Sequence, residues 1–97
     1  MIEFNSLSDV LSKVVEEYNR FRSPEAIASI IELKNNCFVI SFKGNFCFTC
    51  GFYDWFEDFR LILEDYGLKT EISEINQVDI DGFHVKFTLN LNQLLQF

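Results

Sequence analysis

The chain has 97 residues, which is the size of one domain, and we expect residues 1–97 to fold as a single unit. It carries 15 acidic and 8 basic residues, giving a net charge of −7 at pH 7. Nucleic-acid binders rely on Lys and Arg contacts to phosphate, and anionic lipid repels an acidic surface. The charge therefore argues against a nucleic-acid or membrane partner and leaves a basic protein partner open.

The apolar content is high for so acidic a chain: 48% of the residues are hydrophobic, with twelve Phe, three Tyr and one Trp. Because each aromatic side chain buries about 150–250 Å², we expect a second subunit to cover part of this surface. The three cysteines are an odd number, which fits a reducing compartment better than a disulfide framework. Met1 is not followed by a basic signal segment, and no apolar run is long enough to span a membrane, so we expect a cytoplasmic protein.

A first helix is predicted from the N-cap Ser6 to the turn before Pro24. Asp9 stands at the third helical position, as in a capping motif, and proline disfavours helical geometry in the residue before it. Apolar residues at helical spacing predict one buried stripe on this helix: Leu7, Val10, Leu11, Val14, Tyr18 and Phe21.

A hairpin is predicted around Asn35-Asn36, a pair that tolerates the positive φ angles of a type I′ turn. A two-residue turn places Leu33 opposite Phe38 and Ile31 opposite Ile40. This register brings large apolar side chains to one face of the sheet, so it is the register we expect.

A third strand is predicted at residues 46–50, after a three-residue loop. This loop length pairs Phe42 with Phe46 and Ile40 with Phe48. A shorter loop would turn both aromatic side chains of the third strand away from the core, and we therefore reject it.

A second helix is predicted from about Phe52 to Tyr66, with Gly67 as the residue that ends it. Its expected core stripe is Phe52, Trp55, Phe56, Phe59, Ile62, Leu63 and Tyr66. The acidic residues are expected on the opposite, solvated side: Asp54, Glu57, Asp58, Glu64 and Asp65. Leu61 is an isolated apolar residue on that acidic side.

A last hairpin is predicted at Asp81-Gly82, a strong type I′ signal. It pairs Ile80 with Phe83 and Val78 with Val85. The final strand alternates, and we expect four of its residues to face the core: Phe83, Val85, Phe87 and Leu89.

The element order α-β-β-β-α-β-β predicts an α+β fold, a two-layer sandwich in which two helices cover one face of an antiparallel sheet of about five strands. A shift of 45 residues places Phe38 on Phe83 and Phe42 on Phe87. This echo is compatible with an αββ pseudo-repeat, although two units that share the same amphipathic pattern by convergence account for it more simply.

Cys47 and Cys50 have the CxxC spacing of a zinc knuckle or a redox dithiol. A zinc site needs two more ligands, and only Cys37 and His84 are available; the predicted register separates Cys37 from Cys47 by about 13 Å. A thiolate at Cys50 would face acidic residues rather than an activating cation. We therefore favour buried structural cysteines, keep Cys47 and Cys50 as the candidate metal ligands, and predict no cofactor.

No catalytic arrangement is recognisable in the sequence. His84 is the one histidine, and no nucleophile or carboxylate is assigned beside it. Gly-rich phosphate loops and the HExxH and GxSxG motifs do not occur. The sequence therefore favours a non-enzymatic role, and no residue is assigned as catalytic.

The predicted registers leave small apolar side chains on the sheet face that the helices do not cover: Ala28, Ile30, Cys37, Val39, Cys47, Thr49 and Ile75. An antiparallel sheet that meets water should be polar there, and apolar patches mark contact sites. Two-fold self-association is the commonest way to cover such a patch. We therefore expect a homodimer through Ile30, Cys37, Val39 and Cys47, with Leu61 as the apolar contact for a basic protein partner.

The function that the sequence predicts is that of a small acidic α+β module acting through homo-oligomerisation and protein–protein contact. One alternative is a zinc-binding or thiol-redox protein that uses Cys47 and Cys50. Another is an acidic mimic of nucleic acid, which is disfavoured because the acids are spread over several elements.

Overall fold

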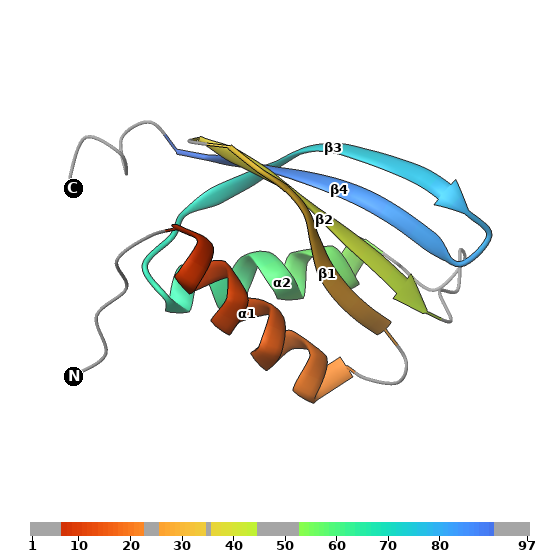
Figure 1. Ribbon diagram of the computed structural model, residues 1–97, viewed down its shortest axis with the longest axis horizontal. Coiled ribbons are helices and arrows are strands. Elements are labelled where there is room, and N and C mark those ends of the chain that lie inside the picture. The colour runs from red at the N-terminus through yellow and green to blue at the C-terminus, as the bar shows by residue number, and fades with distance from the viewer. Residues whose placement is uncertain (1–6, 23–25, 35, 45–52, 91–97) are drawn as a thin grey trace.

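The computed structural model describes residues 7–22, 26–34, 36–44 and 53–90. These residues form two helices and four strands: α1 (Leu7–Arg22), β1 (Ala26–Leu33), β2 (Cys37–Gly44), α2 (Tyr53–Asp65), β3 (Thr70–Asp79) and β4 (Gly82–Leu89). The strands make one antiparallel sheet in the order β1-β2-β4-β3, and both helices lie against the same face of it (Figure 1). The predicted α+β class is confirmed, with four strands in the described part of the chain.

The helix α1 begins at Leu7, directly after the predicted N-cap, which itself lies outside the described residues. The predicted stripe is confirmed from Leu7 to Tyr18: these side chains are buried or pack against the core. Phe21 was wrongly placed in it, since its side chain is 73% exposed. At the end of α1 this position faces an open groove between the helices rather than the sheet.

The helix α2 ends at Asp65, and Gly67 caps it as predicted, with a φ angle of 90°. The amide of Leu68 donates to the carbonyl of Leu63 at 2.9 Å, and that of Gly67 donates to the carbonyl of Glu64 at 2.9 Å. This pair of hydrogen bonds is a Schellman motif. Leu68 and Leu63 are both buried in the core, so the motif also fixes where the chain enters β3. Of the predicted stripe on this helix, Phe52 lies outside the described residues.

The first hairpin has the predicted pairing at its turn and a different one beyond it. Leu33 lies opposite Phe38 as expected, but a β-bulge at Ile31 shifts the register, so Ile40 faces Ile30 instead. A one-residue slip moves every side chain to the other face of the sheet. The predicted register, continued along the strand, places Ile27 and Ile31 on the same face as Ile40, toward the helices. Both placements are wrong, and both side chains are exposed.

The expected outward orientation of three other residues is also wrong. Ala28 is buried in the core, and Ile30 and Ile75 pack against it, because each shares its face with a buried partner strand residue. Ala26 is likewise buried. In β1 the two alanines, rather than the isoleucine between them, therefore lie beneath α1.

The strand β2 has neighbours on both sides, because β1 and β4 pair with it along its whole length. Phe42 lies between Ala28 and Phe83, so the predicted pairing of Phe42 with Phe46 is wrong. The pairing of Ile40 with Phe48 is wrong for the same reason. The predicted strand at 46–50 itself lies outside the described residues.

The strand β4 alternates as predicted, and its four apolar side chains are buried. The turn before it lies one residue earlier than expected, since Asp79 pairs with Gly82 across Ile80-Asp81. Val78 falls at a bulge, so it does not pair with Val85. Positive φ angles outside glycine do not occur among the described residues, which excludes a type I′ turn here.

Phe42 lies at the centre of the core and contacts aromatic rings from both helices and from β4. Its ring centroid is 5.4 Å from that of Tyr18, 4.9 Å from Phe56, 5.5 Å from Phe59 and 6.4 Å from Phe87. Edge-to-face and tilted geometries of this kind add to the free energy gained from burial. This cluster joins the two helices to the centre of the sheet.

The two halves α1-β1-β2 and α2-β3-β4 are related within the sheet by the 45-residue shift. Ile40 pairs directly with Val85, its equivalent 45 residues later. On either side of this pair, Phe38 pairs with Phe87 and Phe42 pairs with Phe83. The 45-residue shift converts one of these pairs into the other, as a two-fold axis between β2 and β4 would. The αββ pseudo-repeat is thus visible in the pairing, while its origin in a gene duplication stays a prediction.

Candidate functional site

Two surfaces of the molecule merit attention as functional sites: the sheet face that the helices leave uncovered, and a groove between α1 and α2. Of the residues predicted to bind a partner, Cys37 and Val39 lie on the uncovered face, on the strand β2, and both are half-buried. Ile30 lies on the helix side, and Leu61 is exposed on α2 as expected. Cys47 lies outside the described residues.

The uncovered face differs between its two halves. On β1 and β2 it carries an apolar set, which we name the β1–β2 patch: Ile27, Ile31, Cys37 and Val39. The side chains of Ile27 and Ile31 are 49% and 53% exposed. The β1–β2 half of this face also carries polar residues: Ser29, Glu32, Ser41 and Lys43. The corresponding face of β3 and β4, where Val78 is 54% exposed at its bulge, is mostly polar: Glu71, Ser73, Glu74, Asn76, His84, Lys86 and Thr88. Both halves therefore mix polar and apolar side chains, and the β1–β2 half carries more of the apolar ones.

The edge of the sheet next to this patch is closed at one position by α1. The side-chain amide of Asn19 donates to the carbonyl of Ala28 at 3.0 Å, and its oxygen accepts from the amide of Ala28 at 2.7 Å. Asn19 thus takes the place of a neighbouring strand at this residue. A partner meeting the β1–β2 patch must therefore pack against side chains rather than extend the sheet at Ala28.

The zinc site that would combine all four candidate ligands is incompatible with the sheet. Cys37 lies opposite Thr88, and His84 lies opposite Ser41, four residues further along. At about 3.3 Å per residue they are roughly 13 Å apart, whereas tetrahedral ligands lie within about 4 Å of one another. Among the described residues, no three His, Cys, Asp or Glu side chains form a group that could hold a metal.

Cys47 and Cys50 both lie outside the described residues, so a zinc or thiol role for them stays a prediction. The distance of about 13 Å predicted between Cys37 and Cys47 assumed that residues 46–50 pair with β2. Because β1 and β4 occupy both sides of β2, that pairing is wrong, and the distance is no argument against a zinc site that contains Cys37 and Cys47. Cys37 is a free cysteine.

The acidic side of α2 is largely paired within the molecule. The Arg60 guanidinium lies 2.9 Å from a carboxylate oxygen of Glu57 and also pairs with Glu64. Asp58 is wrongly predicted to be solvated: it is half-buried, faces α1 and forms an ion pair with Arg22. This contact could not be predicted from the sequence, because the two residues lie on different helices and far apart in the chain.

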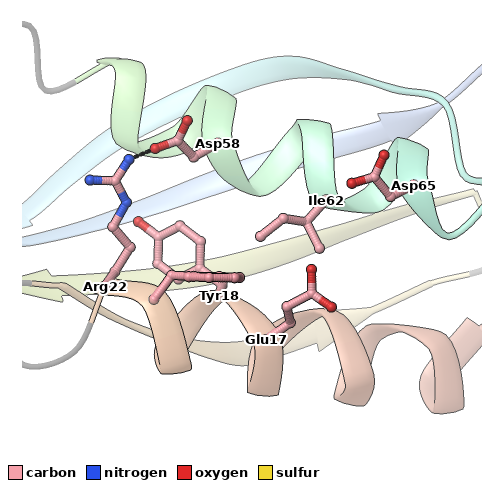
Figure 2. Close-up of a pocket in the computed structure, with 7 residues that line it drawn as sticks. Glu17, Tyr18, Arg22, Asp58, Ile62 and Asp65 are labelled. Atoms are coloured by element: carbon pink, nitrogen blue, oxygen red, sulfur yellow. Dashed lines mark ion pairs between the residues drawn. The ribbon is translucent and has the colours of Figure 1, made fainter.

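Two polar contacts cross the groove between α1 and α2, and Figure 2 shows the one between Arg22 and Asp58. At one end Arg22 pairs with Asp58, and at the other the Tyr66 hydroxyl donates to the Glu17 carboxylate at 3.0 Å. The cavity between them has a volume of about 460 Å³. Its lining combines three acids with apolar and aromatic groups: Glu17, Tyr18, Phe21, Arg22, Asp58, Ile62 and Asp65.

The Tyr18 side chain forms the deepest part of this groove. It is fully buried against Phe42 and Phe59, and its hydroxyl oxygen has no hydrogen-bond partner among the described residues. Burial raises the pKa of Tyr18 well above its ordinary value, against the opposing charge of Arg22. Figure 2 shows the hydroxyl directed into the space between the helices. An unpaired buried hydroxyl costs free energy, about 1–3 kcal/mol in proteins.

The guanidinium group of Arg22 contacts both an aromatic ring and a carboxylate of α2. Its central carbon lies 5.0 Å from the centre of the Trp55 ring, and the same group pairs with Asp58. An aromatic face and a carboxylate thus act together on one cation.

Comparison with protein-family models, curated proteins and solved structures gives no match for this chain. Neither of the two described helices is long and apolar enough to cross a membrane.

Proposed function

We propose that this protein is a non-enzymatic module that acts through homo-oligomerisation and protein–protein contact, with the β1–β2 patch as its self-association surface. The observation that carries the proposal is the exposure of Ile27 and Ile31 on the half of the sheet face that also carries Val39. Exposed apolar side chains with polar surroundings are typical of a contact site. The odd number of cysteines supports a cytoplasmic location for this module.

A second copy of the chain is the partner that fits this patch best. The four patch residues are uncharged, although Glu32 lies opposite Val39 and Lys43 lies opposite Ile27. The chain as a whole carries −7, so copies repel one another at long range and association must come from apolar burial. A two-fold axis would bring each patch against its own equivalent. Four side chains are fewer than a standard interface contributes, so we expect a reversible dimer with micromolar affinity.

The absolute mass in solution, measured by light scattering at tens of micromolar, tests the proposal. We expect the wild type to be dimeric and Val39→Lys to be monomeric, because the substitution places like charges in the two halves of the interface. Asn76→Lys is the matched control: it adds the same charge to the polar half of the same face and should remain dimeric.

Ile27→Lys provides a second variant at a more exposed position, where the fold should tolerate the change. Circular dichroism and a cooperative thermal transition would show that each variant is folded. A monomeric wild type, or folded Val39→Lys and Ile27→Lys proteins that remain dimeric, would contradict the assignment of this surface.

A further inference from the structure

We propose that two copies of the chain pack face to face about a two-fold axis that runs along β2 through Val39, so that Glu32 of each copy pairs with Lys86 of the other. The arrangement rests on the self-association proposed above and extends that surface from β1 and β2 onto β4. It assigns the relative orientation of the two copies and two ion pairs between them.

Val39 lies between two residues of opposite charge on the uncovered face. Glu32 of β1 pairs with it on one side, and Lys86 of β4 pairs with it on the other. Side chains directly opposite one another in an antiparallel sheet lie about 5 Å apart and point to the same face. The three residues therefore form a row across the sheet, with an acid and a base at equal distances from an apolar residue.

The charges of this row are available to a partner. Glu32 and Lys86 lie about 10 Å apart on either side of Val39, which is too far for an ion pair within one chain. Lys86 forms no ion pair within the described residues, although Glu74 lies opposite it on β3. Glu32 contacts Lys34 at 3.6 Å, but both of these side chains are more than half exposed, so this pair contributes little.

The row is self-complementary about only one of the two axes that aligned packing of the sheets through Val39 allows. The two-fold axis lies in the plane between the sheets, either along the strands or across them. An axis across the strands would place Glu32 on Glu32 and Lys86 on Lys86, so that like charges meet. An axis along β2 exchanges the positions of β1 and β4, and brings each Glu32 against a Lys86. The charges therefore select the second orientation.

The far end of the face is compatible with this orientation. Ile27 lies in one row with Lys43 and Gly82, so the axis along β2 places it over Gly82 of the other copy. The Lys43 side chain leans over Gly82, since its Cε and Cγ atoms lie 3.6 and 3.7 Å from the position that a Cβ would occupy there. It thus points away from the axis and offers Ile27 of the other copy an aliphatic surface.

Charge reversal at Glu32 and Lys86 tests this orientation, with the mass in solution measured by light scattering at tens of micromolar. Glu32→Lys and Lys86→Glu should each weaken the dimer about tenfold or more, because each creates two pairs of like charges in the interface. Glu32→Lys separates a local contact from general electrostatics. It makes the chain less acidic, so a change in long-range repulsion alone would strengthen association.

An equimolar mixture of the two variants should form a one-to-one dimer, because one copy then presents two bases and the other presents two acids. The double variant Glu32→Lys/Lys86→Glu should likewise dimerise, since both members of each ion pair are reversed together. Glu74→Lys is the matched control. It makes the same change of charge as Glu32→Lys on the same sheet face, but on β3, outside the contact, and should not weaken the dimer.

Circular dichroism and a cooperative thermal transition would show that each variant is folded. The orientation is overturned if the mixture of folded variants remains monomeric, or if Glu32→Lys dimerises as the wild type does. Self-association through β2 would still stand in that case if the wild type is dimeric and Val39→Lys is monomeric, so the two proposals can fail separately. A monomeric wild type would overturn both.

Discussion

Ile27 and Ile72 are equivalent positions of the two αββ halves, 45 residues apart, yet they face opposite sides of the sheet. Ile27 pairs with Lys43 on the uncovered face and is 49% exposed. Ile72 pairs with Phe87 and packs against the core. The cause is a second bulge in β3, at Ser73, that β1 lacks. One inserted residue therefore decides which half buries its isoleucine and which half exposes it.

The halves also differ in how each helix is attached to its edge strand. Asn19 of α1 makes two hydrogen bonds to the backbone of Ala28 in β1. Its equivalent in α2 is Glu64, which pairs with Arg60 instead. The first half thus holds its edge strand to the helix layer while exposing apolar groups on the other face. We take this to be the half that meets a partner.

The largest expected effect tests whether the two halves contribute equally to the core. Phe42→Ala and its equivalent Phe87→Ala should each destabilise the protein by about 3–5 kcal/mol, because both rings are fully buried in the aromatic cluster. Urea denaturation measures this loss. Phe21→Ala, which removes an exposed ring, should cost less than ~0.5 kcal/mol. A much smaller loss for one of the two core variants would show that the halves are not equivalent in energy.

A smaller effect is expected where the halves differ. Asn19→Ala should cost about 1–3 kcal/mol, because it leaves the N–H and C=O of Ala28 without partners at a partly buried edge. Glu64→Ala should cost at most about 1 kcal/mol, since it removes a largely exposed ion pair. Hydrogen exchange should report faster exchange of the Ala28 amide in the first variant. Equal costs, with the Ala28 amide still protected, would refute the special role of Asn19.

The smallest effect is expected at Tyr18. Its equivalent in the second half, 45 residues later, is the apolar Leu63. Burial raises the pKa of Tyr18 above the unfolded value of about 10, so the neutral phenol is favoured in the folded state. Its contribution is complete below pH ~10 and is lost as the pH rises toward the folded pKa. Tyr18→Phe removes the unpaired hydroxyl, so it should raise stability at pH 7 by about 1 kcal/mol and reduce the decline above pH ~10.

Unfolding free energies measured across the alkaline range test this. Tyr66→Phe is the comparison, because burial and the Glu17 carboxylate also raise the pKa of Tyr66 but its side chain is only partly buried. An alkaline decline that is identical in Tyr18→Phe and wild type would show that this phenol does not titrate with unfolding.

The sequence was sufficient for the features that depend on local patterns. The stripes of α1 and α2, the glycine cap at Gly67 and the alternation in β4 follow from spacing that a single element determines. Register could not be obtained in this way. The bulges at Ile31 and Ser73 insert one residue without any residue type that marks them, and each reverses the faces beyond it.

The candidate sites were predictable to a smaller extent. Val39 and Cys37 were correctly expected on the uncovered face, whereas Ile30 was not, because its orientation depends on the bulge. The helix groove was missed entirely. Its polar contacts join residues that are far apart in the sequence, and helical spacing alone groups Asp58 with the solvated acids of α2, although Arg22 of α1 lies opposite it.

Concentration-dependent methyl spectra of the wild-type protein test the central claim most directly, because they report each half of the sheet face separately. On raising the protein concentration into the tens of micromolar, we expect the methyl signals of Ile27, Ile31 and Val39 to shift together. The signal of Val78, which is 54% exposed on β3, should remain unchanged. Spectra without any concentration dependence, or shifts confined to Val78 and its neighbours, would contradict the assignment of self-association to the β1–β2 patch.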